Sequence, residues 1–273
     1  MSSTARRMFG LFEPIGAIPY AADEPTEALL ALGFTEFWDT YFAGRAAPLG
    51  LVPAEVVDAL FYNFAPGEVA RHIPKVWRTT TPEAAIAARQ RGAAAALRRI
   101  LGDLVEASAF ARATELLLAA ATSAPIGGRP MYAALRSIPV PGDGVSRMFH
   151  AASLLREHRG DGHIAALRIE GVSGLESHVL HALAAGQPAH TFGRVHHLPS
   201  AQLGAAIDGL RARGLIADDG WLSEPGHALK RRVEQLTDVL AAAPYGALSP
   251  SELDELIAAL EPLATRLLAA SDH

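Results

Sequence analysis

The chain has 273 residues, half of them hydrophobic and 19% charged, which is enough for one large domain or two of ordinary size. It has no cysteine, so disulfides, thiolate nucleophiles and cysteine-ligated zinc are excluded. No apolar stretch reaches the roughly 18 residues of a transmembrane helix, and we expect no signal peptide, which makes a cytoplasmic protein the default. The net charge of -5 gives no overall attraction to nucleic acid.

Proline and glycine divide the first half of the chain into helical segments. Breaks fall at residues 48–50, 65–67, 126–128 and 139–144. Between them, Thr81 and Pro82 have the pattern of a helix start. The break at 139–144 lies near the midpoint of the chain. We therefore predict two units, residues 1–140 and residues 145–273.

The second half shows a recognisable order of elements. We expect a helix over residues 174–184, a short helix or turn over 190–197, a helix over 200–213 and a small hairpin over 215–223. A long helix then runs to Ala243, and a last helix begins at Ser249. This is the order of a winged helix-turn-helix unit. The predicted fold class is therefore mainly α.

A shift of 119 positions aligns the two halves. It places Glu115 on Glu234, Leu117 on Leu236, Ala124 on Ala243, Pro125 on Pro244 and Gly127 on Gly246. The order of elements also repeats. We infer two tandem, degenerate winged-helix units that form an intramolecular pseudo-dimer, which needs no partner chain and so favours a monomer. The alternative is that alanine-rich helices align by chance.

The densest run of ionisable side chains lies in residues 156–163, which read REHRGDGH. We predict a turn at residues 160–162, with Asp161 as the N-cap of the helix that follows. In the pseudo-dimer, Arg45 would reach this run from an equivalent loop across the dyad. Arginines near a helix start favour a carboxylate or a phosphate as ligand.

Several roles are open for these side chains. A small-molecule or anion site would use Arg45, His150, Arg156, Glu157, Arg159 and Asp161. Acid–base catalysis would use His158 and His163, so whether the chain is an enzyme stays open. A divalent metal or a haem would be held by His150, His163 and His181, although no short metal-binding motif is present. The alternative to all three is a buried ion-pair network that ties helices together.

Residues 210–229, which contain the segments LRARGLIADDG and LSEPGHAL, resemble the multiple-antibiotic-resistance regulator (MarR-type) superfamily. Nearly the whole chain also resembles a bacterial family of MarR-like helix-turn-helix proteins. The second resemblance rests on YFAGRAAPLG at 41–50, FYNFAPGEVAR at 61–71 and LLREHRGDGHIAAL at 154–167. The two resemblances imply a winged-helix fold and, for the MarR type, a ligand-responsive transcriptional regulator.

The helix in the recognition position is poor in groups that read DNA. Over residues 200–209 only Gln202 suits base readout, and Asp208 repels phosphate. The tip of the wing carries Asp218 and Asp219, where a DNA-binding wing would be basic. Our leading hypothesis is a protein that binds a small anionic or metal-containing ligand in a His/Arg/Asp pocket between the halves. A DNA-binding regulator is the alternative, and no membrane partner is expected.

Overall fold

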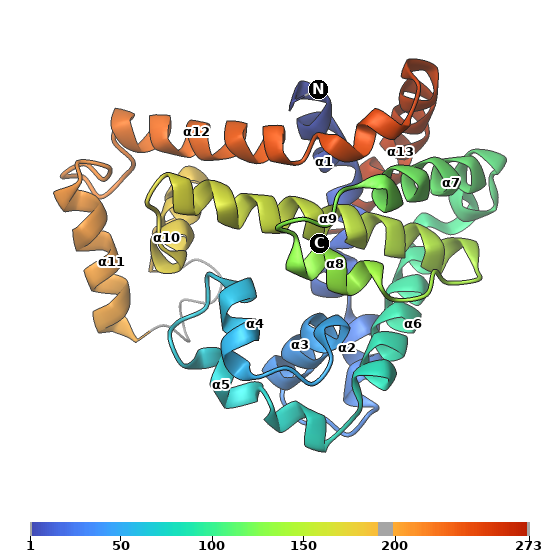
Figure 1. Cartoon of the computed structure of the whole chain (residues 1–273), viewed down its shortest axis with the longest axis horizontal. Helices are drawn as coiled ribbons and strands as arrows, with labels where there is room; N and C mark the ends of the chain where they lie inside the picture. Colours follow the sequence, from blue (N-terminus) through green and yellow to red (C-terminus); the bar gives the residue numbers. More distant parts are fainter. Residues whose placement is uncertain (1, 191–198, 272–273) are drawn as a thin grey trace.

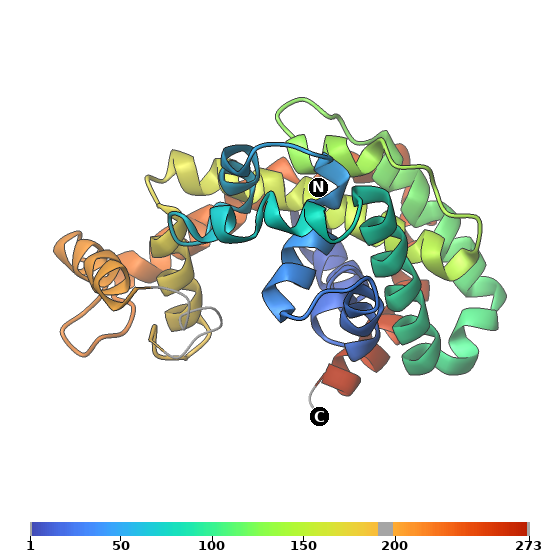
Figure 2. The same cartoon turned by 90° about the horizontal axis from the view of Figure 1, so that it is seen from below.

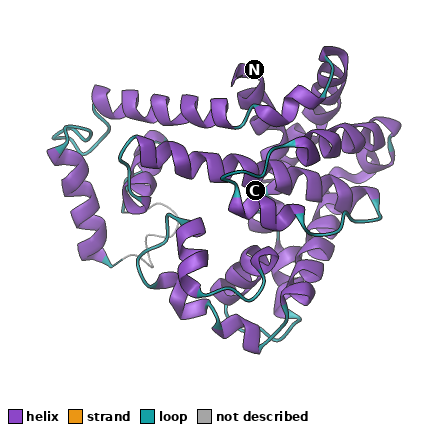
Figure 3. Cartoon of the chain, in the orientation of Figure 1, coloured by secondary structure: helices purple, strands orange, loops and turns teal. Residues whose placement is uncertain are grey.

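The computed structural model describes residues 2–190 and 199–271, and most of them are helical (Figure 3). The α-helices are α1 (Ser2–Gly16), α2 (Asp23–Leu30), α3 (Phe37–Ala46), α4 (Ala54–Phe61), α5 (Glu68–His72), α6 (Pro82–Leu101), α7 (Ser108–Ser123), α8 (Pro130–Arg136), α9 (Gly144–Ile169), α10 (Gly174–Ala184), α11 (Ser200–Ala212), α12 (Glu224–Leu240) and α13 (Pro250–Ser271). Short 3-10 helices are η1 (Ile18–Tyr20), η2 (Ala47–Leu49), η3 (Lys75–Arg78), η4 (Gly102–Glu106) and η6 (Ala243–Ala247). The mainly α fold class is confirmed.

The long helix α9 lies at the centre of the molecule (Figure 1). It packs against α1, α6, α7, α8 and α12, while α1 also packs against α13. Many of the contacting residues are alanines, such as Ala93, Ala151 and Ala152, which are fully buried and let helices approach closely. One large core therefore contains the first and the last helix together with α6, α7 and α9.

Two smaller cores flank this large one. Phe42, Val57 and Phe61 belong to a core formed by α2 to α6, with Met131 of α8. Val179 and Leu229 belong to a core formed by the end of α9 with α10, α11 and α12. Figure 2 shows α11 at the far end of the molecule from α6 and α7. Among the described residues, no helix is long and apolar enough to cross a bilayer.

The charged run 156–163 does not contain the predicted turn, because α9 continues without a break through both glycines to Ile169. Glycine in a helix interior costs about 1 kcal/mol relative to alanine, which packing here outweighs. A Cβ atom on Gly162 would lie 2.2 Å from Nη1 of Arg129. That guanidinium donates to the carbonyl oxygens of His158 (2.9 Å) and Leu240 (2.8 Å), so Gly162 makes room for a bridge between α9 and α12.

The predicted helices of the second half are confirmed at α10, α11, α12 and α13, with α12 ending three residues before the expected Ala243. The predicted hairpin is much smaller than expected. Among the described residues, β pairing is limited to one antiparallel bridge between Ile216 and Leu222, supported by the bond from Ala217 N to Trp221 O (2.9 Å). The helix or turn expected at 190–197 falls largely on residues 191–198, which lie outside the described residues.

Candidate functional site

A cavity of about 360 Å³ lies beside α9, where helices from both halves of the chain meet. Its walls come from α3, the end of α4, α8, α9, α10 and α12. The polar side chains that line it are Arg45, Tyr62, Asn63, Arg156, Glu157, Asp161, His163, Ser177, His178, His181 and Lys230. Apolar side chains such as Phe61, Met131 and Val233 complete the lining. This volume and mixture of groups are typical of a small-molecule site.

Two arginines and one glutamate form the polar end of the cavity. Glu157 Oε2 lies 3.7 Å from Nη2 of Arg45, and Glu157 Oε1 lies 3.5 Å from Nη1 of Arg156. Burial raises the pKa of Glu157, but Arg45 and Arg156 act more strongly together, so this pKa lies below its usual value. The carboxylate is therefore ionised, and it offsets only part of the positive charge.

The guanidinium of Arg45 has N–H donors that its protein contacts do not use. Its Nη1 donates to Tyr41 Oη at 3.0 Å, and its guanidinium carbon lies 4.4 Å from the centre of the Phe61 ring. Its buried Nε has no hydrogen-bond partner. A guanidinium has five N–H donors, so Nη1 and Nη2 of Arg45 carry more donors than their contacts with Tyr41 and Glu157 use. Arg156 is more fully engaged, because its Nε also donates to Glu13 at 3.0 Å.

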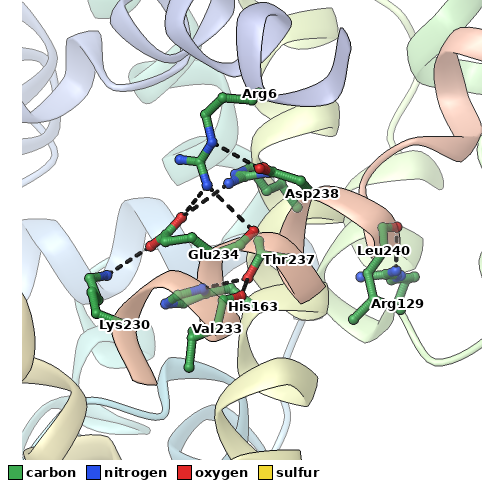
Figure 4. A network of polar contacts seen from close by, with 10 residues as sticks. Arg6, Arg129, His163, Lys230, Val233, Glu234, Thr237, Asp238 and Leu240 are labelled. Carbon is green, nitrogen blue, oxygen red and sulfur yellow. Dashed lines mark hydrogen bonds and ion pairs between the residues drawn. The ribbon is translucent and has the colours of Figure 1, made fainter. Parts of the chain in front are cut away.

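His163 lies further along the same wall and is held by α12 (Figure 4). Its Nδ1 is 2.9 Å from Thr237 Oγ1, and that hydroxyl donates its one proton to Val233 O at 2.7 Å. Nδ1 must therefore carry a proton and donate it to Thr237. Burial lowers the pKa of His163 to about 4, although Glu234 acts in the opposite direction. The ring is therefore neutral at pH 7, and its Nε2 is a hydrogen-bond acceptor.

Asp161 lines the cavity, but the helix whose start it caps is not the one we expected. Its carboxylate accepts from the backbone N–H groups of Tyr132 (3.0 Å) and Met131 (3.4 Å), so it caps the start of α8. Burial raises the pKa of Asp161 to about 6, and the two backbone donors act against this rise. The prediction that Asp161 is the N-cap of a helix after 162 is wrong, since α9 has no break there.

Three predicted site residues lie away from this cavity. His158 is buried, its Nε2 has no partner, and its ring meets the face of Tyr132 edge-on. Arg159 points to α1 and α12, where Nη1 is 2.8 Å from Asp238 Oδ1 and Nη2 is 3.4 Å from Glu234 Oε2. His150 is buried beside a small void of about 20 Å³. The structure therefore does not bring these three residues into this cavity, and their predicted ligand and acid–base roles stay predictions.

The predicted metal ligands do not come together. His150 and His163 are 13 positions apart on one helix, which separates them by about 20 Å. His163 and His181 both line the cavity. Across residues 2–190 and 199–271, however, no three or more His, Asp or Glu side chains are grouped to hold a metal ion. The predicted metal set of His150, His163 and His181 is therefore not assembled within the described residues.

The ion pairs that we considered as an alternative are present in part, since Arg156 pairs with Glu13 and Glu157 while Arg159 belongs to a network with α12. Arg6 of α1 binds Glu234 (2.6 Å) and Asp238 (2.9 Å), and Lys230 binds Glu234 at 2.7 Å (Figure 4). Burial raises the pKa of Glu234, but these cations outweigh it and bring the pKa to about 2. Arg159 completes the network and joins α9 to α1 and α12.

Other cavity residues had no local signal in the sequence. Tyr62 at the end of α4 has a φ of 23°, an uncommon conformation for a residue other than glycine. Its hydroxyl donates to Val172 O at 2.6 Å. Its carbonyl oxygen would lie 1.8 Å from a Cβ on Gly174. Tyr62 thus anchors the start of α10 to the first half of the chain. Lys230 and Thr237 are likewise placed only by the packing of α12 on α9.

Comparison with protein families supports the helix-turn-helix architecture. A model described as a helix-turn-helix family matches residues 5–273. The chain belongs to this helix-turn-helix family. Neither the curated proteins nor the solved structures contain a match to it. Membership therefore supports the general fold, and fold alone does not determine function.

Proposed function

We propose that this helix-turn-helix protein binds a small organic anion, a carboxylate or a phosphate ester, in the cavity beside α9. The observation that carries the proposal is the pair Arg45 and Arg156 at one end of the cavity. Glu157 and Glu13 pair with these arginines, and the guanidinium of Arg45, which lines the cavity, has more N–H donors than its protein partners use. Charge-assisted hydrogen bonds from a guanidinium to an anion are among the strongest polar contacts in proteins.

The finer architecture that we propose is a MarR-like pseudo-dimer with units 1–140 and 145–273. The arrangement of cores supports it. One small core belongs to α2–α6 and another to α10–α12, while α1, α6, α7, α9 and α13 share the large core between them. The cavity takes Arg45 and Tyr62 from the first unit and most of its other polar lining from the second. In this proposal the ligand lies between the two units of a single chain.

Calorimetric titration with inorganic phosphate and with 3-phenylpropionate tests the anion site. We expect Arg45→Met to weaken the binding of both probes by about tenfold or more, because each loses a charge-assisted hydrogen bond. Arg112→Met is the matched control, since Arg112 is exposed on α7 and pairs with Glu255 at 3.2 Å. The proposal fails if neither probe binds at millimolar concentration, or if Arg45→Met binds as the unaltered protein does.

A second candidate is a ligand-responsive DNA-binding regulator, and family membership favours it. The described surface of α11 argues against strong DNA binding, because Arg211 pairs with Asp208 (3.0 Å) and Arg213 pairs with Glu176 (3.0 Å). A regulator should bind a defined operator with an affinity that falls steeply with salt. Fluorescence anisotropy with DNA fragments at low and moderate salt measures this, and a lack of binding at low salt removes the candidate.

A further inference from the structure

Two polar parts of the cavity lining, the arginine end at Arg156 and the part around His163, lie along helix α9. Arg156 and His163 both line the cavity and are seven positions apart on α9, or about 10 Å along the helix axis. Gly160 lies between them in the same wall. A Cβ atom there would meet nothing closer than Glu157 Oε2 at 3.9 Å, so the helix backbone itself forms this part of the wall. The space between the two ends is therefore open.

The two ends differ in chemistry. Arg45 and Arg156 offer N–H donors and positive charge, whereas His163 offers a neutral acceptor, since Thr237 engages its Nδ1 proton. The nearest cation at that end, Lys230, is bound to Glu234 at 2.7 Å. Phe61, Met131 and Val233 add apolar surface to the lining. A ligand that fills the cavity needs an anion at one end, apolar groups that contact this surface and a hydrogen-bond donor at the other end.

We propose that the ligand is an elongated amphipathic anion whose far end carries a hydroxyl or an N–H group, and that Nε2 of His163 accepts a hydrogen bond from it. This inference rests on the proposed anion site and names the class of molecule that fits it. The Thr237 hydroxyl is a positioning group, because it holds the imidazole in the tautomer with a bare Nε2. A partly buried acceptor that stays unpaired loses free energy, so His163 discriminates against a ligand that lacks the donor.

Two matched pairs of probes test this inference. The short pair is 3-(4-hydroxyphenyl)propionate and 3-phenylpropionate, and the long pair is 5-(4-hydroxyphenyl)pentanoate and 5-phenylpentanoate. We expect the protein to prefer the hydroxylated member of at least one pair by about tenfold. His163→Phe should abolish the preference, because no acceptor then remains for the hydroxyl group to satisfy or for the other member to leave unpaired. His227→Phe is the control, because His227 is exposed on α12 and does not line the cavity.

Thr237→Val is the second variant, and it keeps the imidazole while removing its hydrogen-bond partner. In the unaltered protein, nitrogen-15 NMR should show His163 with a protonated Nδ1 and an unprotonated Nε2. In Thr237→Val the tautomer preference and part of the hydroxyl preference should be lost. This spectroscopic signature separates a positioning role from a purely structural one, and it can be measured even if His163→Phe does not fold.

The outcomes distinguish this inference from the proposed function. If both members of each pair bind equally well while Arg45→Met weakens them, the anion site stands and the role of His163 is overturned. A hydroxyl preference that survives in His163→Phe, or a protonated Nε2 in the spectrum, overturns it too. If neither the aryl carboxylates nor inorganic phosphate bind, the proposed function fails and this inference fails with it.

Discussion

The run of residues 156–163 has two sides with different tasks. Arg156, Glu157 and His163 line the cavity beside α4 and α10. His158 and Arg159, which lie between them in the sequence, face the core and the ion-pair network with α1 and α12. The same residue types therefore serve a candidate site on one side of α9 and the stability of the fold on the other.

This contrast follows from the 3.6-residue period of a helix, which sends neighbouring side chains in different directions. A dense run of ionisable residues in a sequence thus need not form a single site. On the side away from the cavity, Arg159 pairs with Asp238 and Glu234, while Nε2 of His158 has no hydrogen-bond partner. On the cavity side, Arg45, Arg156 and His163 line open space.

The strongest test of the contrast between the two sides of α9 is to replace Arg159 and Arg156, one at a time, by methionine. Arg159→Met should lower the free energy of unfolding by about 3 kcal/mol, because it breaks buried ion pairs and leaves Asp238 and Glu234 with fewer cations. Arg156→Met should cost less, about 1 to 2 kcal/mol, because Glu13 loses its ion pair but the Arg156 side chain is 24% exposed and Arg45 remains beside Glu157. Urea unfolding measures both values.

Ligand titration of the same two variants should give the reverse order. Arg156→Met should weaken 3-phenylpropionate binding by about tenfold, whereas Arg159→Met should leave it nearly unchanged at temperatures where the variant is folded. Equal effects of the two replacements on binding would show that the run does not divide into two sides as we describe.

The sequence predicts the elements whose signals are local. Thr81 caps α6 by accepting from Ala84 N at 3.2 Å, and Ser249 with Glu252 starts α13 through reciprocal hydrogen bonds. Ser173 and Glu176 form a capping box at α10, whose range matches the predicted one. The unbroken helix α9 was not predictable in this way, because the partner that Gly162 accommodates, Arg129, lies 33 positions earlier in the sequence.

The candidate site was predictable only in part, for the same reason. Arg45 lies 3.7 Å from Glu157 of the other half of the chain, but it lies in helix α3 and not in the loop that the alignment of the two halves predicts. Asp161 and His163 also line the cavity. Lys230 and Thr237 come from α12, and only the packing of α12 on α9 shows that they control the His163 end. Whether these residues bind a ligand stays a prediction until binding is measured.

His158, which is buried, offers a second test of the contrast, because its protonation opposes folding. Burial lowers the pKa of His158 to about 4, and Arg129 lowers it further. The unfolded chain therefore takes up the proton first as pH falls from 6.5 to 4, and stability is lost over this window. The cost from His158 alone is about 3 kcal/mol at pH 4.

His158→Leu should remove this loss and be nearly neutral at pH 8, where the ring is uncharged and its Nε2 has no partner. Urea unfolding at pH 8, 6, 5 and 4 measures how the free energy of unfolding depends on pH. His150 and His163 also have a pKa lowered to about 4. The free energy of unfolding of the variant should therefore still fall in acid, by the part that these two histidines cause. A curve parallel to that of the unaltered protein would place His158 in contact with water.

The two glycines of the run give the smallest expected effects, with opposite signs. Alanine is favoured over glycine by about 1 kcal/mol in a helix interior, and Gly160→Ala meets no atom closer than 3.9 Å, so it should stabilise the protein by up to that amount. Gly162→Ala should instead destabilise it by about 1 to 2 kcal/mol. The new methyl group would displace the Arg129 guanidinium from the His158 and Leu240 carbonyls. If both variants were stabilised alike, Arg129 would not bridge α9 and α12, and the two sides of the run would not differ.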